Sequence, residues 1–238
     1  MTGGAGFAGD GRSPQGAASI TALSALAQLQ ALLESVHGIE VAAPVGDFLV
    51  GATARERFGL ASDEALLVRE DGEELRVALF LEEGVLVQLA QSAGAPWTRE
   101  RLQGFCQAAE GVSHFLYLWH RARAGRPVSR LELEAQAELD KYLCVLLQLW
   151  AVGRRKASAE LRRRLFEAVG YRKDLSTAER DRYRLANALA AACARVLEAK
   201  YVLAGRLEGL LREVRKLYRL GGGEKLSALA SGQVAWAA

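Results

Sequence analysis

The stretch EALLVREDGEELRVALFLEEG, residues 64–84, decides the fold because it combines two strand-like runs with a strong turn signal. Asp71-Gly72 separates the runs, and an Asp-Gly pair between apolar runs predicts a tight β-hairpin. In the second run Leu75, Val77, Leu79 and Leu81 alternate with Arg76, Ala78, Phe80 and Glu82. This pattern predicts one buried face and one mixed face. An isolated hairpin is barely stable in water, so further strands or a helix must cover it.

The residues before and after the hairpin supply candidates for that cover. VGDFLVG, residues 45–51, is a candidate third strand, and the residues after Gly84 suit either another strand or a short helix. Residues 17–36 read as a helix that ends at Gly38 and has one apolar face, formed by Ala22, Leu26, Leu29, Leu33 and Val36. The other face of this helix has almost no charge. This predicts packing on two sides or pairing with another chain.

From Trp97 onward the hydrophobic pattern is helical almost to the end of the chain. One helix is expected over residues 99–124. A second starts at Ser129, which forms a capping box with Glu132, and a third covers about residues 158–169. The capping-box spacing of Ser176 and Glu179 opens a helical stretch that reaches Arg219. Such a stretch would be about 60 Å long, so a bend is expected at Gly205 or Gly209. Small residues in ALAAACA, residues 188–194, predict close helix packing or an oligomer interface.

These elements predict an α+β fold that is predominantly helical, with a small N-terminal β-hairpin or sheet unit and a C-terminal antiparallel helical bundle. Residues 1–16 are Gly-rich and are expected to be a disordered tail. The helix and β-rich unit should span residues 17–94, and the bundle should span residues 97–219. A flexible C-terminal tail is expected over residues 220–238.

Composition places the chain among ordinary globular proteins. Half of its 238 residues are hydrophobic and a quarter are charged. The three cysteines are far apart and odd in number, which is typical of reduced, buried thiols in a cytosolic protein. We find neither the ~20-residue apolar run that a bilayer requires nor a secretory signal, so a cytoplasmic protein with no membrane partner is expected. Abundant Ala, Leu, Gly and Arg fit a GC-rich bacterial genome.

Charge is distributed unevenly along the chain. Residues 1–120 contain 7 Lys+Arg and 15 Asp+Glu, whereas residues 121–238 contain 24 and 13. This asymmetry indicates either an anionic partner for the C-terminal part or attraction between the two halves. Basic residues are dense over 121–184, and the candidate anion-binding residues there are Arg154, Arg155, Lys156, Arg162, Arg163 and Arg164. No helix-turn-helix, zinc-finger or base-stacking pattern accompanies them.

The predicted helix 99–124 contains one polar stripe opposite a broad apolar face. The residues of the stripe that form a candidate binding surface are Gln103, Gln107, Glu110, His114, Tyr117 and Arg121. Glu110 and His114 are four residues apart and can touch, which suits acid–base chemistry, with Tyr117 as a third catalytic candidate. His120 points away from the stripe. The other interpretations of the stripe are a solvent-exposed face, the lining of a groove, or a contact with a partner.

No metal or cofactor is expected from the sequence, because one helix offers only Glu110 and His114 as ligands and the Glu-x-x-His pattern is missing. In the next helix Glu134, Glu138 and Lys141 read as a solvated charged face. Gln136 lies at the edge of the apolar arc and needs a hydrogen-bond partner if it is buried.

Phosphate-loop, dinucleotide-binding, nucleophile-elbow and H-E-x-x-H patterns are missing from the chain. The favoured hypothesis is therefore a non-enzymatic bacterial cytoplasmic protein-interaction module or scaffold, whose partner is another protein or a second copy of itself. The first alternative is binding of nucleic acid or another polyanion through the Arg-rich surface of residues 121–184. The second alternative is an enzyme that uses a Glu110/His114 acid–base pair.

Overall fold

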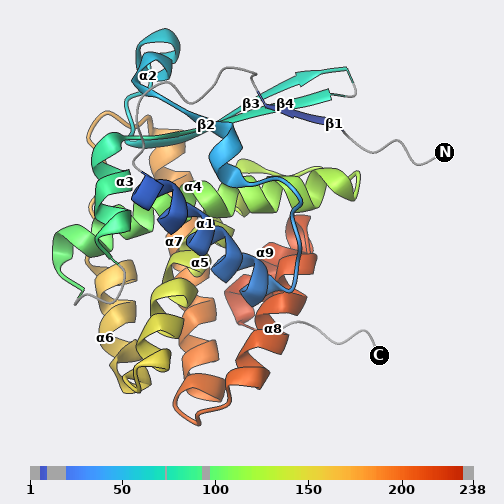
Figure 1. The fold of residues 1–238 in the computed structure, drawn as a ribbon. Helices are drawn as coiled ribbons and strands as arrows, with labels where there is room; N and C mark the ends of the chain where they lie inside the picture. The colour runs from blue at the N-terminus through green and yellow to red at the C-terminus, as the bar shows by residue number, and fades with distance from the viewer. Residues whose placement is uncertain (1–5, 10–19, 73, 93–96, 233–238) are drawn as a thin grey trace. The chain divides into compact units, whose positions relative to one another are not determined.

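The computed structural model describes residues 6–9, 20–72, 74–92 and 97–232, and the chain forms two compact units. Unit 1 comprises Met1–Glu34 and Ile39–Pro127, and unit 2 comprises Ser35–Gly38 and Val128–Ala238. The fold is α+β and predominantly helical, as predicted (Figure 1). The division between the units differs from the predicted one. The helix expected over residues 99–124 belongs with the sheet and not with the bundle.

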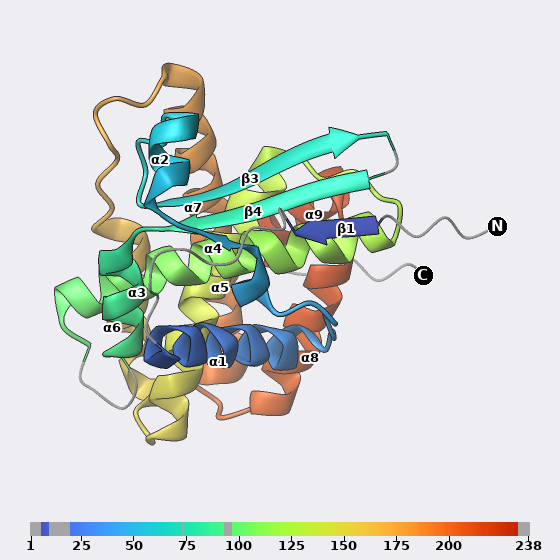
Figure 2. The ribbon, with the colours of Figure 1, turned by 45° about the horizontal axis from the view of Figure 1, so that its top comes forward.

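Strand β4, Glu74–Leu81, is the centre of the sheet in unit 1 (Figure 2). It pairs antiparallel with β3, Glu64–Asp71, and Gly72 takes a φ of +64° between them, so the predicted hairpin is confirmed. On its other edge β4 pairs in parallel with β1, Gly6–Gly9, and with β2, Leu49–Val50. Strand β1 corrects the prediction of a disordered tail at residues 6–9, because backbone groups at the edge of β4 offer it a partner. The other residues of that predicted tail lie outside the described residues.

The candidate third strand at residues 45–51 is only partly a strand. A 3-10 helix, η1, covers Val45–Phe48, and just two residues of β2 follow it. The backbone N–H of Asp47 donates to the carbonyl of Pro44 at 3.0 Å, which closes a turn where an extended strand was expected. Helix α2, Ala52–Phe58, follows β2, and the residues after Gly84 form helix α3, Glu83–Ala90.

Helix α4, Arg99–Arg123, packs against β3, β4 and α3. Figure 1 shows it running along one face of the sheet. The predicted apolar face of β4 is buried, and Leu79 is fully excluded from solvent. A Cβ atom at Gly111 of α4 would lie 2.8 Å from Leu79 Cδ1, so the missing side chain allows the helix to approach the sheet closely. Gly125, with a φ of +61°, follows the end of α4, as predicted.

Helix α1, Ile20–His37, buries the predicted apolar face and is followed by Gly38, whose φ is +60°. Within unit 1, its Gln30 holds the following loop. The Gln30 Oε1 atom accepts from the N–H of Val45 at 2.7 Å, and its Nε2 donates to the carbonyl of Ala43 at 3.1 Å. The uncharged opposite face is exposed, with Ile20 at its start 89% exposed. Packing of that face on a second side is therefore not seen in the described residues.

Unit 2 is helical. Helix α5, Arg130–Ala151, and helix α7, Thr177–Leu197, each begin with the predicted capping box, formed by Ser129 with Glu132 and by Ser176 with Glu179. Between them lie the 3-10 helix η2, Arg155–Ala157, helix α6, Ser158–Arg162, and a π-helical turn η3, Arg163–Glu167. After α7 come a π-helical turn η4, Glu198–Val202, helix α8, Leu207–Arg219, and helix α9, Gly222–Ser231.

Helix α7 packs against both α5 and α9. Its buried small residues, Ala186, Ala190, Cys193 and Ala194, are fully excluded from solvent, which confirms the close packing predicted there. The predicted bend falls at Gly205, whose φ is +68°. Helix α9 corrects the prediction of a flexible tail from residue 220, because Lys225, Ala228 and Leu229 lie in the core of unit 2.

Replacing Gly104 tests the close contact between α3 and α4. A Cβ atom at Gly104 would lie 2.5 Å from the Cβ of Gln88. The Gln88 Cβ is bonded to the α3 backbone, so it cannot move aside easily. We expect Gly104→Ala to lower the free energy of unfolding by about 1–3 kcal/mol in urea denaturation. The control is Gly84→Ala, where nothing lies within 4 Å, and it should be neutral or stabilising by up to about 1 kcal/mol. Equal effects of the two changes would contradict the contact.

Candidate functional site

The polar stripe on α4 is partly interior. Gln103 is exposed and Gln107 and Glu110 are partly exposed, but His114 is 8%, Arg121 6% and Tyr117 0% exposed. A single open binding surface over all six predicted residues is thus not what the structure shows. Tyr117 and Arg121 are core residues. Arg121 donates to the carbonyl of Pro127 at 3.0 Å, so it holds the turn after α4.

The start of β3 covers the middle of the stripe. Residues opposite each other in an antiparallel pair face the same side of the sheet. Glu64 lies opposite Leu81, on the face that α4 covers. Its Oε1 atom is 3.5 Å from Nδ1 of His114, and the neighbouring Asp63 accepts a hydrogen bond from Gln107 Nε2 at 3.3 Å. One carboxylate at the start of β3 and one just before it therefore lie near two predicted stripe residues.

Arg55 of α2 neutralises part of this acidic cluster. Its guanidinium lies 2.9 Å from Asp63 Oδ1 and 2.8 Å from Glu82 Oε2, and it donates to the carbonyl of Ser62 at 3.0 Å. The same guanidinium stands 5.4 Å above the ring of Phe80. Arg55 thereby joins α2, the start of β3 and the end of β4. Glu64 is not among its partners in the described residues.

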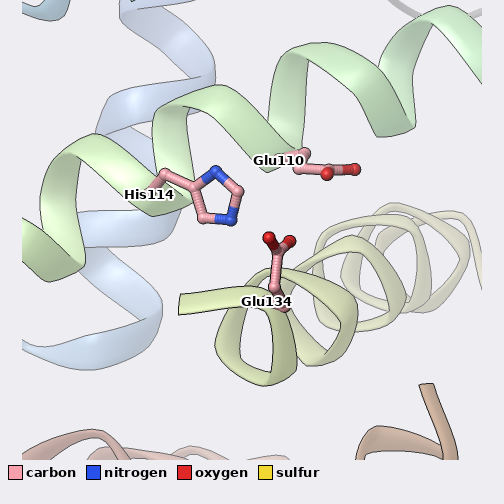
Figure 3. A group of neighbouring side chains, drawn as sticks. All are labelled: Glu110, His114 and Glu134. Atoms are coloured by element: carbon pink, nitrogen blue, oxygen red, sulfur yellow. The ribbon is translucent and has the colours of Figure 1, made fainter. Parts of the chain in front are cut away.

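Glu110 and His114 leave the same side of α4, one helical turn apart (Figure 3). Their potential ligand atoms lie within 4.8 Å of each other. Unit 1 therefore places an imidazole near two carboxylates, those of Glu64 and Glu110. Such a set can hold a cation or move a proton. Glu134, also drawn in Figure 3, belongs to α5 of unit 2, where its carboxylate lies 3.8 Å from Arg182 Nε of α7.

The predicted anion-binding arginines are largely engaged with acids of unit 2. Arg162 lies 3.1 Å from Glu198 and 3.5 Å from Glu167, and Arg163 pairs with Glu160. Arg155 stacks over the ring of Trp150 at 5.9 Å. Arg164 is half-buried, whereas Arg154 and Lys156 are exposed. The six residues therefore do not form one uncompensated basic surface.

A buried polar network in unit 2 was not predicted as a site. His37 Nε2 lies 2.8 Å from Asp140 Oδ1, and Gln136 Nε2 donates to that same oxygen at 2.8 Å. The Gln136 Oε1 atom in turn accepts from Lys225 Nζ at 2.6 Å. The His37 ring stacks on Tyr218 with centroids 3.9 Å apart. Each of these side chains is at most 1% exposed, so the network is a structural core and not an open site.

Part of this network has a signal in the sequence. Gln136 was expected to need a partner if buried, and it has two. Asp140 lies one turn further along the same apolar arc of α5, which could have marked the pair. His37 and Lys225 carry no such signal. His37 precedes Gly38, the glycine predicted to end the helix. Lys225 comes shortly after Gly221-Gly222-Gly223, in a stretch that resembles a tail.

A basic hollow lies along α8. Its volume is about 580 Å³, and the described residues that line it are Glu208, Leu211, Arg212, Arg215, Lys216 and Arg219. Arg215 donates to the carbonyls of Val36 at 3.2 Å and Ser35 at 2.9 Å. Residues 35–38 end helix α1 and belong to unit 2. The guanidinium groups thus satisfy carbonyls that a helix end leaves without partners.

Comparisons with protein-family models, curated proteins and solved structures found no match to this chain. Among the described residues, no helix combines the length and the apolar character needed to cross a bilayer.

The buried network predicts that Lys225 stabilises unit 2. Lys225→Met should lower the free energy of unfolding by about 1–3 kcal/mol, because the oxygens of Gln136 and Leu217 lose a buried donor. The exposed Lys200→Met is the control and should change stability by less than about 0.5 kcal/mol. Urea denaturation followed by circular dichroism measures both. A Lys225→Met chain as stable as the wild type would show that the ammonium group is dispensable.

The three free thiols should differ in reactivity. Cys144 and Cys193 are fully buried, whereas Cys106 is partly exposed. Burial raises the pKa of the Cys193 thiol to about 12, although the nearby Lys225 opposes the shift. Because the thiolate is the reactive form, iodoacetamide at about pH 8 should label Cys106 in the native chain and the other two only in denaturant. Peptide mass spectrometry checks this. Rapid native labelling of Cys193 would contradict the closed core of unit 2.

Proposed function

We propose that this chain is a non-enzymatic cytoplasmic protein-interaction module that holds an acidic segment of a partner protein against α8. The observation that carries this proposal is the basic hollow, where four cationic side chains, one carboxylate and one leucine line the same face of one helix. Its volume lies within the usual range of binding pockets. The three free cysteines support a reducing compartment.

The charge of the three arginines on this face, Arg212, Arg215 and Arg219, is poorly compensated within the described residues. Among the described residues, no carboxylate oxygen lies within 4.0 Å of the guanidinium groups of Arg212, Arg215 or Arg219. Arg215 and Arg219 instead donate to backbone carbonyls, including that of Gly38 at 3.4 Å. These bonds orient the side chains but leave their net positive charge in place. Unit 2 as a whole carries 21 Lys+Arg and 13 Asp+Glu, a net charge of +8.

The chemistry of the hollow favours an acidic protein segment over a nucleic acid. Leu211 offers an apolar contact, which suits a segment that mixes acidic and apolar side chains better than a phosphate backbone. Arg212 and Arg219 are seven residues apart, so the row spans only about 10 Å of helix. No aromatic side chain lines the hollow among the described residues, whereas binding of single strands relies on stacking.

A second copy of the chain is one source of such a segment. Unit 1 carries 10 Lys+Arg and 15 Asp+Glu, a net charge of −5, opposite in sign to unit 2. The exposed, uncharged face of α1 would also tolerate a neighbouring chain. Size-exclusion chromatography with light scattering, at low and high salt, decides whether the partner is a second copy.

Charge reversal on α8 tests the proposal directly. The probe is a fluorescent peptide of alternating Glu and Leu, titrated with the full chain at about 50 and 200 mM salt. We expect saturable binding that weakens with salt, and at least about tenfold weaker binding for Arg212→Glu, because like charges at an interface cost several kcal/mol.

The matched control is Arg195→Glu, which makes the same change in net charge at an exposed position of α7. It should retain most of the affinity. Equal losses in both variants, or no binding of the peptide at low salt, would exclude a specific site on α8. Tighter binding of single-stranded DNA than of the peptide would favour the polyanion alternative instead.

A further inference from the structure

We infer that unit 1 holds a divalent transition-metal ion between Glu110 and His114 of α4, with Glu64 of β3 orienting the imidazole. The sequence alone offered two ligands on one helix, and on that basis no metal was expected. The structure adds a carboxylate from a strand far away in the chain. This site is separate from the basic face of α8 and does not depend on the function proposed for that face.

The spacing of the two ligands suits a metal. Residues four apart on a helix lie one above the other, and this spacing also separates the two zinc-binding histidines of the H-E-x-x-H pattern. The ligand atoms of Glu110 and His114 are already within 4.8 Å of each other. Zinc binds histidine nitrogen and carboxylate oxygen at about 2.0–2.2 Å, so a small rotamer adjustment brings both atoms onto one ion.

Glu64 supplies the support that metal-bound histidines normally have. A histidine ligand usually presents one ring nitrogen to the metal and donates the N–H of the other to a carboxylate. The Oε1 atom of Glu64 lies 3.5 Å from Nδ1 of His114, an ion-pair distance that a small side-chain movement shortens to a hydrogen bond, so the second role is assigned to Glu64 and Nε2 to the metal. The side chains of His114 and Glu64 are 10% and 11% exposed, which holds the ring in place.

Local charge also favours a cation. Asp63, Glu64 and Glu82 converge near the stripe from the start of β3 and the end of β4. The guanidinium of Arg55 pairs with Asp63 and Glu82. The carboxylates of Glu64 and Glu110 lie near the imidazole, and negative charge close to a bound cation stabilises it. Glu110 is partly exposed, so water can complete the coordination shell.

The ligand types select the class of metal. Imidazole nitrogen with carboxylate oxygen and water suits Zn²⁺, Co²⁺ or Mn²⁺. Calcium prefers six to eight oxygen ligands, and copper(I) prefers sulfur. Because the described part of unit 1 supplies two direct ligands, the site should exchange its metal readily.

Titration of the chelator-treated full chain tests the inference. The probes are Zn²⁺ by calorimetry and Co²⁺ by its visible absorption. We expect one saturable site in the wild type, and loss of at least about tenfold in affinity for His114→Gln and for Glu110→Gln. Glu64→Gln should weaken binding by about 10–100-fold, as expected for a residue that orients a ligand.

The control variant is His120→Gln, which removes a histidine from the same helix at a position outside the site. It should bind Zn²⁺ as the wild type does. A measurement on the wild type does not depend on whether a variant folds. In nitrogen-15 histidine spectra of the wild type, Zn²⁺ should shift the ring signals of His114 and leave those of His37 unchanged. Absence of saturable Zn²⁺ and Co²⁺ binding, or a loss in His120→Gln equal to that in His114→Gln, would overturn the site.

Discussion

The register of the β3–β4 hairpin is the constraint on which unit 1 depends. Eight consecutive pairs, from Glu64 opposite Leu81 to Asp71 opposite Glu74, fix which side chains face α4. A slip of β3 by one residue would turn Glu64 away from the face that α4 covers, where the apolar side chains of β4 lie. The burial of Leu79 and the approach of Glu64 to His114 are therefore consequences of the same pairing.

The core of unit 2 contains charged and polar groups, which need hydrogen-bond partners because they are buried. Gln136 connects the carboxylate of Asp140 to the ammonium of Lys225 through a single amide, with its oxygen toward the cation and its nitrogen toward the anion. This arrangement gives each buried charge a partner of suitable polarity. The stacked rings of His37 and Tyr218 lie beside it, so four separate segments of the chain meet in one polar cluster.

Local signals in the sequence predicted the elements well. The Asp71-Gly72 turn, both capping boxes, the buried face of α1 and the bend at Gly205 depend on nearby residues, and all are present. The third strand at residues 45–51 and the flexible tail after residue 219 were wrong for most of their length. A turn at Pro44 determines the structure of the first region, and the burial of Lys225 determines that of the second. Both depend on tertiary contacts, which cannot be predicted from the periodicity of the sequence.

The candidate site was only half predictable for the same reason. Helical spacing brought Glu110 and His114 together and separated His120 from them. It could not predict Glu64, which is fifty residues away from His114 and reaches it only through the hairpin register. Helical spacing also could not predict that Tyr117 and Arg121 are buried. The sequence pattern of a polar stripe is the same whether the stripe faces solvent or another part of the protein.

The inclusion of residues 35–38 in unit 2 bears on how the chain acquires its structure. The network needs both His37 and Lys225, which lie far apart in the sequence, so it cannot close until the segment that carries Lys225 has been synthesised. Contacts across such long sequence separations slow folding, because loop entropy must be lost before they form. A fragment that starts at residue 128 would lack the imidazole partner of Asp140. Unit 2 is therefore compact in space, although its two segments, Ser35–Gly38 and Val128–Ala238, are separated in the sequence.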